Sequence, residues 1–212
     1  MAEVAGHPFV EYVLRQVGRA GIHEIVVCAG HGADLVVETI GDGRRFGLSV
    51  SYSVEQELLG TAGALKHAAP ALGDSTFLVM NGDSFFDIPL GDLFSFHASH
   101  GGAATIALAR TTSTARFGTV RIDPQGRVTD FAEKQEGSGS GLINAGLYVF
   151  GPAMLDLIPD RQRVSLEQDV FPQLVGSGLF GRPFDGFFVD IGVPSDYAKL
   201  CAEPDQLVGA AN

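Results

Sequence analysis

The amino-acid sequence predicts a mixed α/β fold, and three observations point to it. Short apolar runs at residues 25–29 and 76–81 are bounded by turn residues, as in strands that are buried on both faces. Helical spacing of apolar residues alternates with such runs in the first half of the chain. Later, runs at residues 119–122 and 128–133 flank Asp123-Pro-Gln-Gly126, which has the residues of a β-hairpin turn. Alternation early and hairpin pairing later together predict a mixed sheet.

The N-terminal elements follow from their periodicity. Apolar side chains recur at helical spacing over residues 8–18, and Pro8 suits the first turn of a helix. The run over residues 22–29 reads as a buried strand, and glycines then lead into a helix over residues 34–40. Between residues 48 and 54, serines alternate with apolar residues, which is the pattern of a half-buried strand.

The remaining elements are predicted from the same signals. A glycine-containing segment at residues 60–65 opens a short helix that Pro70 closes, and the central strand at residues 76–81 follows. The later predicted elements are a helix at 89–100, a strand at 103–109, the hairpin described above, a flexible connector at 137–141, a strand at 142–150, helices at 152–158 and 166–175, a strand within 184–191 and a helix at 194–201.

Length and composition limit the classes of protein. With 212 residues, 45% of them hydrophobic, we expect a single domain over residues 1–202 and a loosely held tail over 203–212. The net charge of −11 and the absence of clustered basic residues argue against nucleic acid as a partner. No apolar run reaches the roughly 18 residues of a membrane span, and Cys28 and Cys201 show no metal-ligand spacing. We expect a cytoplasmic protein.

Asp83 is the first candidate site residue. It ends the stretch Phe77-Leu-Val-Met-Asn-Gly-Asp83, just past the carboxyl end of the predicted central strand. Ligands of open α/β sheets bind at that edge, and a carboxylate there suits Mg²⁺, which prefers oxygen ligands. Asn-Gly-Asp is also common turn chemistry, so a plain loop is the alternative. Asp190 repeats the arrangement after Phe187-Phe-Val, and two such carboxylates would suffice to hold one Mg²⁺ beside a substrate phosphate.

Three further segments carry candidate residues. Gly60, Thr61 and Gly63 open a helix where backbone groups can approach a ligand, although Thr61 could simply cap that helix. Glu133-Lys134 could contact ligand hydroxyls and a phosphate, or form an exposed ion pair. Asn144 falls inside an apolar strand, where its amide needs a partner, either a sugar hydroxyl or a backbone group.

Taken in order, the motifs resemble those of sugar-1-phosphate nucleotidyltransferases, and especially the D-glycero-D-manno-heptose 1-phosphate guanylyltransferase branch. The resemblance implies a Rossmann-like mixed sheet of the nucleotide-diphospho-sugar transferase type. The motifs that carry the resemblance are Gly6-His-Pro-Phe-Val-Glu-Tyr, Leu59-Gly-Thr-Ala-Gly-Ala, Asn81-Gly-Asp, Phe117-Gly-Thr-Val, Phe131-Ala-Glu-Lys, Ile143-Asn-Ala-Gly-Leu-Tyr-Val-Phe, Ser165-Leu-Glu-Gln-Asp-Val-Phe-Pro and Val189-Asp-Ile-Gly-Val-Pro.

The resemblance also implies roles for the candidate residues. Asp83 and Asp190 would hold Mg²⁺, and Lys134 would contact the phosphate of the sugar. Gly60, Thr61 and Gly63 would lie against the nucleobase, while Gly118, Glu133 and Asn144 would contact the sugar. The implied reaction is attack of a sugar 1-phosphate on the α-phosphorus of a nucleoside triphosphate, with GMP as the expected group transferred.

The chain departs from the family pattern at its start. Family members open with a strand and a glycine-rich loop that wraps the triphosphate, and this sequence lacks both. We therefore expect slow turnover or none. The alternative is a non-catalytic sugar-phosphate-binding or regulatory module. A homo-oligomer is left open, because Phe180, Phe184, Phe187 and Phe188 could be core or interface.

Overall fold

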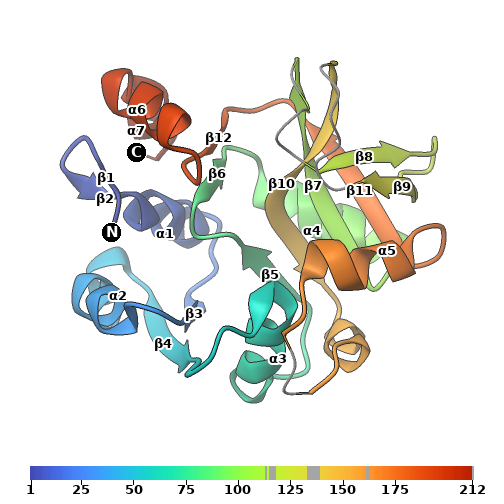
Figure 1. The fold of residues 1–212 in the computed structure, drawn as a ribbon, viewed down its shortest axis with the longest axis horizontal. Helices are drawn as coiled ribbons and strands as arrows, with labels where there is room; N and C mark the ends of the chain where they lie inside the picture. Colours follow the sequence, from blue (N-terminus) through green and yellow to red (C-terminus); the bar gives the residue numbers. More distant parts are fainter. Residues whose placement is uncertain (113, 115–117, 133–138, 161–162, 212) are drawn as a thin grey trace. The chain divides into compact units, whose positions relative to one another are not determined.

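The computed structural model describes residues 1–112, 114, 118–132, 139–160 and 163–211 (Figure 1). The backbone divides into two compact units. Unit 1 contains residues 1–57, 81–88 and 186–212, and unit 2 contains residues 58–80 and 89–185. Both ends of the chain belong to unit 1. Because unit 1 is made of three separate stretches, the division between the units is not marked by a single linker in the sequence.

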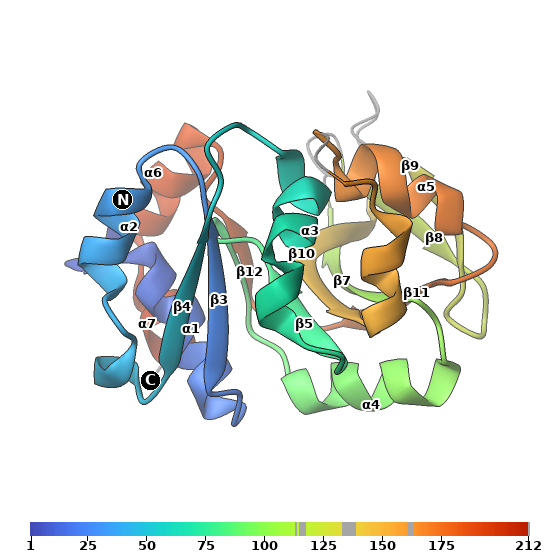
Figure 2. The same ribbon diagram turned by 90° about the horizontal axis from the view of Figure 1, so that it is seen from below.

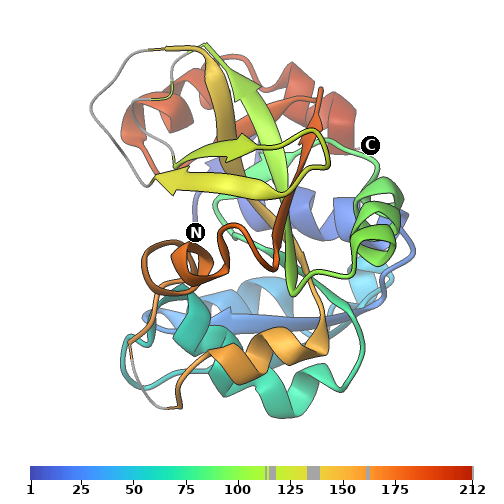
Figure 3. The same cartoon turned by 90° about the vertical axis from the view of Figure 1, so that its right-hand side faces the viewer.

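Unit 2 is built around a mixed sheet, which confirms the predicted fold class (Figure 3). The strands lie in the order β11, β7, β10, β8 and β9, and β5 also pairs with β10. β11 and β7 run parallel, and the other described ladders are antiparallel. The strands are β5 (Phe77–Met80), β7 (Ala104–Thr111), β8 (Thr119–Ile122), β9 (Val128–Ala132), β10 (Gly141–Phe150) and β11 (Leu179–Phe184).

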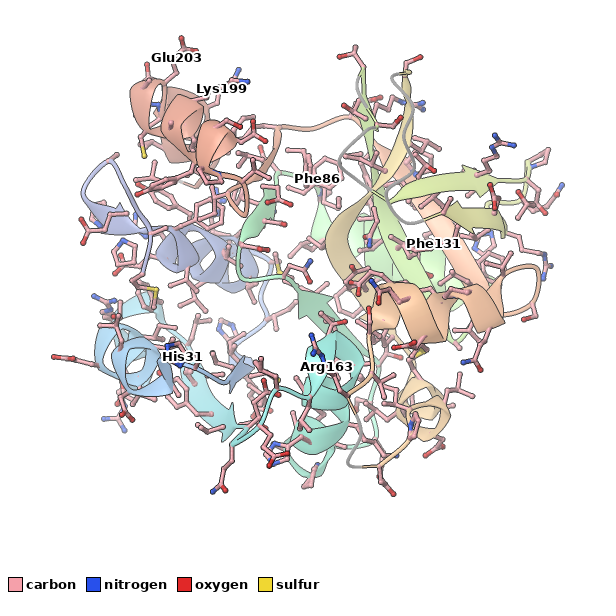
Figure 4. The ribbon with its side chains drawn as sticks, in the orientation of Figure 1. His31, Phe86, Phe131, Arg163, Lys199 and Glu203 are labelled. Atoms are coloured by element: carbon pink, nitrogen blue, oxygen red, sulfur yellow. The ribbon has the colours of Figure 1, made fainter. Side chains whose placement is uncertain are left out.

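β10 and β7 form the buried centre of this sheet. Residues 145–150 of β10 and 104–109 of β7 are all buried, as continuous apolar runs predict. Tyr148 lies 5.3 Å, centroid to centroid, from Phe171, and Phe131 of β9 packs edge-on against Phe171 at 5.5 Å (Figure 4). These aromatic contacts join the sheet to the segment after β10, so burial of large side chains fixes the position of that segment.

The helical segments of unit 2 depart from prediction in detail. α3 continues through Pro70 to Leu72, and the helix predicted at 166–175 is a π-helical turn followed by a short α-helix. β11 was not predicted, because the late strand was placed at 184–191. The helical elements are α3 (Gly60–Leu72), α4 (Leu90–His100), the 3₁₀-helix η2 (Pro152–Leu157), the π-helix η3 (Leu166–Val170) and α5 (Phe171–Leu174).

Unit 1 contains a parallel strand–helix–strand arrangement (Figure 2). β3 and β4 pair in parallel, joined through α2, as the alternation of patterns predicts. The apolar face of α1 is buried. On that face, Leu14 packs in one hydrophobic cluster with Ile40 and Leu48. The elements are β1 (Glu3–Val4), β2 (His7–Pro8), α1 (Phe9–Arg19), β3 (Glu24–Ala29), α2 (Ala33–Ile40), the 3₁₀-helix η1 (Arg44–Phe46) and β4 (Ser49–Val54).

The other part of unit 1 pairs β6 (Ser84–Phe86) with β12 (Phe188–Asp190). Phe86 is buried against Phe188, with ring centroids 5.7 Å apart (Figure 4). α6 (Pro194–Ala202) follows β12, and Lys199 and Glu203 project from its end (Figure 4).

The segment after residue 203 is helical. It forms α7 (Asp205–Ala211), and the side chain of Leu207 is fully buried. α7 packs against α1, and both the buried Leu207 and a hydrogen bond from Arg19 to the carbonyl of Ala210 hold it there.

Candidate active site

Asp83 and Asp190 come together in unit 1. β6 and β12 are antiparallel, and Asp190 lies opposite Ser84, which directly follows Asp83. The backbone N–H of Ile191 donates to the carbonyl oxygen of Asp83 over 2.8 Å. The ladder therefore continues one residue beyond the strands and fixes the two aspartates beside each other.

Gly192 lies between the two carboxylates. A Cβ built on it would lie 3.0 Å from Asp190 Oδ1 and 3.3 Å from Asp83 Oδ2. Its N–H donates to Asp190 Oδ1 over 2.7 Å, and Ser84 Oγ donates to Asp83 Oδ1 over 3.3 Å. Both carboxylates thus converge on a space that is open because Gly192 has no side chain. A neighbouring hydrogen-bond donor orients each carboxylate.

This pair of carboxylates fits a hard divalent cation such as Mg²⁺. Among the described residues no group of three or more acidic, His or Cys side chains could hold a metal. Mg²⁺ is commonly bound by one or two carboxylates, with water and phosphate oxygens completing its octahedron. A cation between Asp83 and Asp190 would therefore leave most of its coordination positions to a phosphorylated substrate.

Replacing Gly192 by Ala should weaken cation binding. The added methyl group would occupy the space between the carboxylates, and changes next to metal ligands typically cost 10- to 100-fold in affinity. We expect the affinity for Mn²⁺, a paramagnetic substitute for Mg²⁺, to fall by about tenfold in an electron paramagnetic resonance titration. Gly82→Ala is the matched control, because its Cβ would meet no atom within 4 Å. Equal affinities of the two variants would contradict this geometry.

In unit 2, Glu167 is the centre of a hydrogen-bond network. Its Oε2 accepts from Thr61 Oγ1 over 2.9 Å and from Ser165 Oγ over 2.8 Å. Its Oε1 accepts from the hydroxyl of Tyr148 over 3.3 Å, and that hydroxyl accepts from Nδ2 of Asn144 over 2.9 Å. A carboxylate thus connects the first turn of α3 to β10, and its bonds to hydroxyl donors are charge-assisted.

The glycine-containing segment that opens α3 is held against residue 164. The N–H groups of Ala62 and Gly63 donate to the carbonyl of Val164 over 3.0 and 3.2 Å, and Thr61 Oγ1 accepts from the N–H of Leu166 over 2.8 Å. Thr61 does not cap α3, whose first turn has no side-chain cap. Its hydroxyl instead joins the Glu167 network.

The side chain of Asn144 is hydrogen-bonded to other groups of the protein, as its position in an apolar strand requires. Its Oδ1 accepts from the N–H of Gly146 over 3.0 Å, besides the bond from Nδ2 to Tyr148. Its own N–H donates to the carbonyl of Gly118 over 3.0 Å. The register of β10 with β7 shifts between Asn144 and Tyr148, and such irregularities often redirect side chains at functional sites.

The candidate residues therefore form two groups. Asp83 and Asp190 belong to unit 1, whereas Gly60, Thr61, Gly63, Gly118 and Asn144 belong to unit 2. Glu133 and Lys134 lie outside the described residues. Glu167 was not predicted individually, although Ser165-Leu-Glu-Gln carries the spacing of a helix-capping box, and Ser165 Oγ does accept from the N–H groups of Glu167 and Gln168.

Replacing Glu167 by Gln should destabilise the protein. The amide would present a donor to hydroxyl groups that now donate to a carboxylate, so at least one charge-assisted bond is lost. We expect the free energy of unfolding to fall by about 1–2 kcal/mol in a urea titration. Asp156→Asn makes the same chemical change at an exposed position of η2 and should leave stability unchanged. The network would be energetically unimportant if both variants unfolded at the same urea concentration.

Nearly the whole chain is similar to known nucleotidyltransferases. The family model described as "Nucleotidyl transferase" matches residues 1–205. Mannose-1-phosphate guanylyltransferase of Mycobacterium tuberculosis is 34% identical over 96% of this chain, and the chain spans 57% of that relative. D-glycero-alpha-D-manno-heptose 1-phosphate guanylyltransferase of Aneurinibacillus thermoaerophilus is also 34% identical, over 96% of this chain and 87% of its own length.

A solved structure agrees with these sequence matches. The crystal structure of HddC from Yersinia pseudotuberculosis complexed with GMP-PN superimposes with a TM-score of 0.84 and 27% identity, over 96% of this chain and 88% of HddC. In the described residues, no helix is long and apolar enough to cross a membrane. The match over nearly the full chain, the mixed sheet and the convergence of Asp83 and Asp190 lead to one conclusion: the chain belongs to the nucleotidyl transferase family.

Proposed function

We propose that this protein transfers GMP from GTP to a sugar 1-phosphate, giving a GDP-sugar and pyrophosphate. The observation that carries the proposal is the convergence of the Asp83 and Asp190 carboxylates on Gly192, in a chain of the nucleotidyl transferase family. Guanine is proposed as the base because both relatives described above are guanylyltransferases.

In the proposed reaction an oxygen of the sugar phosphate attacks the α-phosphorus of GTP. A new P–O bond forms as the bond to the β-phosphate oxygen breaks, and pyrophosphate leaves with the electron pair of that bond. Mg²⁺, when bound, supplies positive charge to the phosphate oxygens on which negative charge develops. The protein needs no nucleophile, so its task is to position both substrates and to neutralise charge.

The proposed roles divide between the two groups of residues. Asp83 and Asp190 hold Mg²⁺. Gly60, Thr61 and Gly63 lie against the nucleobase. Gly118, Glu133 and Asn144 contact the sugar, and Lys134 contacts its phosphate. Support comes from the Glu167 network, which fixes Thr61 and Asn144 through shared hydrogen bonds and so limits their motion before a ligand binds.

The proposed sugar has the manno configuration. Mannose and D-glycero-D-manno-heptose, the sugars in the names of the two relatives, share the configuration of the pyranose ring and differ in the exocyclic chain. We accordingly expect mannose 1-phosphate or the heptose 1-phosphate to be accepted in preference to glucose 1-phosphate. We also propose that this activity takes place in the cytoplasm.

Phosphorus NMR tests the proposal. We expect GTP, Mg²⁺ and a manno-configured sugar 1-phosphate to give GDP-sugar and pyrophosphate in equal amounts, and identification of the products does not depend on a high rate. The expectation of slow turnover is tested separately, by kcat. Binding of the sugar phosphate by calorimetry with no product, even after long incubation, would instead favour a non-catalytic sugar-phosphate-binding module.

A further inference from the structure

Unit 1 contains an open surface cavity that the proposed reaction does not use. It has a volume of about 840 Å³ and lies along α1, next to the turn before it and to η1. Neither Asp83 nor Asp190 lines it. The residues that decide its chemistry are His7, Glu11, Arg15, Arg19, Arg45 and Phe46.

The lining of this cavity is positively charged although the protein is acidic. Three arginines and one glutamate give the lining a formal charge of +2 with His7 neutral, whereas the whole chain carries −11. Arginines 15 and 19 follow Glu11 on one face of α1 at the four-residue spacing of neighbouring turns. A concentration of arginine in one concave place, on a chain with only 14 lysine and arginine residues, favours an anionic ligand.

Glu11 fixes the cations rather than cancelling them. Its side chain is 7% exposed, and Oε1 accepts from Arg45 Nη2 over 2.6 Å. Oε2 lies 3.4 Å from His7 Nδ1 and 3.9 Å from Arg15 Nη2. The same Arg45 nitrogen donates to the carbonyl of Thr39 over 2.6 Å. A single buried carboxylate thus hydrogen-bonds Arg45 and lies within ion-pair distance of His7 and Arg15.

Some hydrogen-bond donors of the basic side chains that line the cavity remain accessible to a ligand. The side chains of His7, Arg15 and Arg45 are 50%, 36% and 52% exposed, and each guanidinium has five N–H groups in a planar fork. The Arg45 guanidinium lies 4.4 Å from the centroid of the Phe46 ring, which supports its plane from one side. Planar forks that are held before binding match phosphate oxygens, which they can contact in pairs.

We propose that this cavity binds a small, multiply charged phosphate compound, at a site separate from the Asp83–Asp190 pair. Its volume is within the range of about 300–1,000 Å³ that is typical of small-molecule sites. A single negative charge would not balance the lining, so the ligand carries at least two, as a pyrophosphate or oligophosphate group does. This inference does not rest on the proposed function.

Calorimetry with inorganic pyrophosphate tests the proposal. EDTA is present throughout, so that no divalent cation can recruit pyrophosphate to Asp83 and Asp190. We expect Arg15→Gln to weaken binding by about tenfold, the size of one lost charge-assisted contact. Arg15→Lys should lose part of that affinity, because it keeps the charge but not the fork. Arg15 is partly exposed and its ion pair with Glu11 is long, so the variants should fold.

Two controls separate this site from others. Arg44→Gln removes the same charge from a neighbouring position. The side chain of Arg44 is 88% exposed and, unlike that of Arg45, does not line the cavity. Asp83→Asn alters the candidate active site. Both should bind pyrophosphate as the unaltered protein does. The proposal is overturned by undetectable binding at millimolar pyrophosphate, by Arg15→Gln binding normally, or by loss of binding in either control.

Amide NMR gives an answer that needs no variant. Pyrophosphate should shift the backbone amide signals of Gly6, Gly18 and Phe46, which line the cavity. Shifts confined to residues 83–86 and 188–192 would place the ligand at the carboxylate pair and would contradict the proposal.

Discussion

Asp190→Asn should lower the rate of GDP-sugar formation by about 10²- to 10³-fold, the size of effect seen when one group that stabilises transition-state charge is removed. An amide oxygen is a weaker Mg²⁺ ligand than a carboxylate, and the lost negative charge is half of what the pair offers the cation. Asp83→Asn should have a similar effect. The rate is measured by pyrophosphate release at saturating Mg²⁺, relative to the unaltered chain.

The control is Asp87→Asn, which makes the same replacement at an exposed position just beyond the other end of β6. It should leave the rate unchanged. Because Gly192 N–H donates to Asp190, the fold of each variant is checked by its thermal transition. An Asp190→Asn protein that folds normally and retains its rate would show that this carboxylate does not hold the catalytic cation.

Gly60→Ala should lower the free energy of unfolding by about 2–4 kcal/mol, from two costs that add. Gly60 has φ of +75°, which an L-residue adopts at a penalty. A Cβ there would also lie 2.6 Å from the carbonyl oxygen of Val164, and that oxygen is held by the N–H groups of Ala62 and Gly63. The clash is with backbone, so rotation of a side chain cannot relieve it. Urea titration followed by circular dichroism measures the change.

Gly101→Ala separates the two costs. Gly101 ends α4 in the left-handed helical region, with φ of +64° and ψ of 27°, but a Cβ there would meet no atom within 4 Å. It should therefore show the conformational cost alone, about 1–2 kcal/mol. The difference between the variants reports the close approach of Gly60 to Val164. Equal destabilisation would mean that the loop moves away from Val164 at little cost.

Local patterns predicted most of the secondary structure and the two aspartates. β10 and β7 are long apolar runs, so their burial follows from composition. Asp83 and Asp190 each follow a short apolar run and lie within two residues of a glycine, which is a signal visible in sequence. β6 was missed because a three-residue strand has too few side chains to show a period, and α7 because a single buried leucine shows no period.

Local sequence patterns could not predict contacts between residues that are far apart in the chain. Glu167 is separated from Thr61 by more than a hundred residues, and only the fold brings its carboxylate to that hydroxyl. The alternatives for Asn144 were a sugar hydroxyl or a backbone group, and the structure shows a backbone N–H and a tyrosine hydroxyl as its partners. The division into two units was hidden for the same reason, since unit 1 combines three stretches of sequence.

The most direct test of the proposed function is the phosphorus NMR spectrum of a mixture of this chain, GTP, Mg²⁺ and mannose 1-phosphate or the manno-configured heptose 1-phosphate. Formation of GDP-sugar with an equal amount of pyrophosphate, dependent on Mg²⁺ and slowed about 10²- to 10³-fold by Asp190→Asn, is the predicted result. Release of inorganic phosphate from GTP without any GDP-sugar, or no product from either sugar phosphate, would contradict guanylyl transfer by this chain.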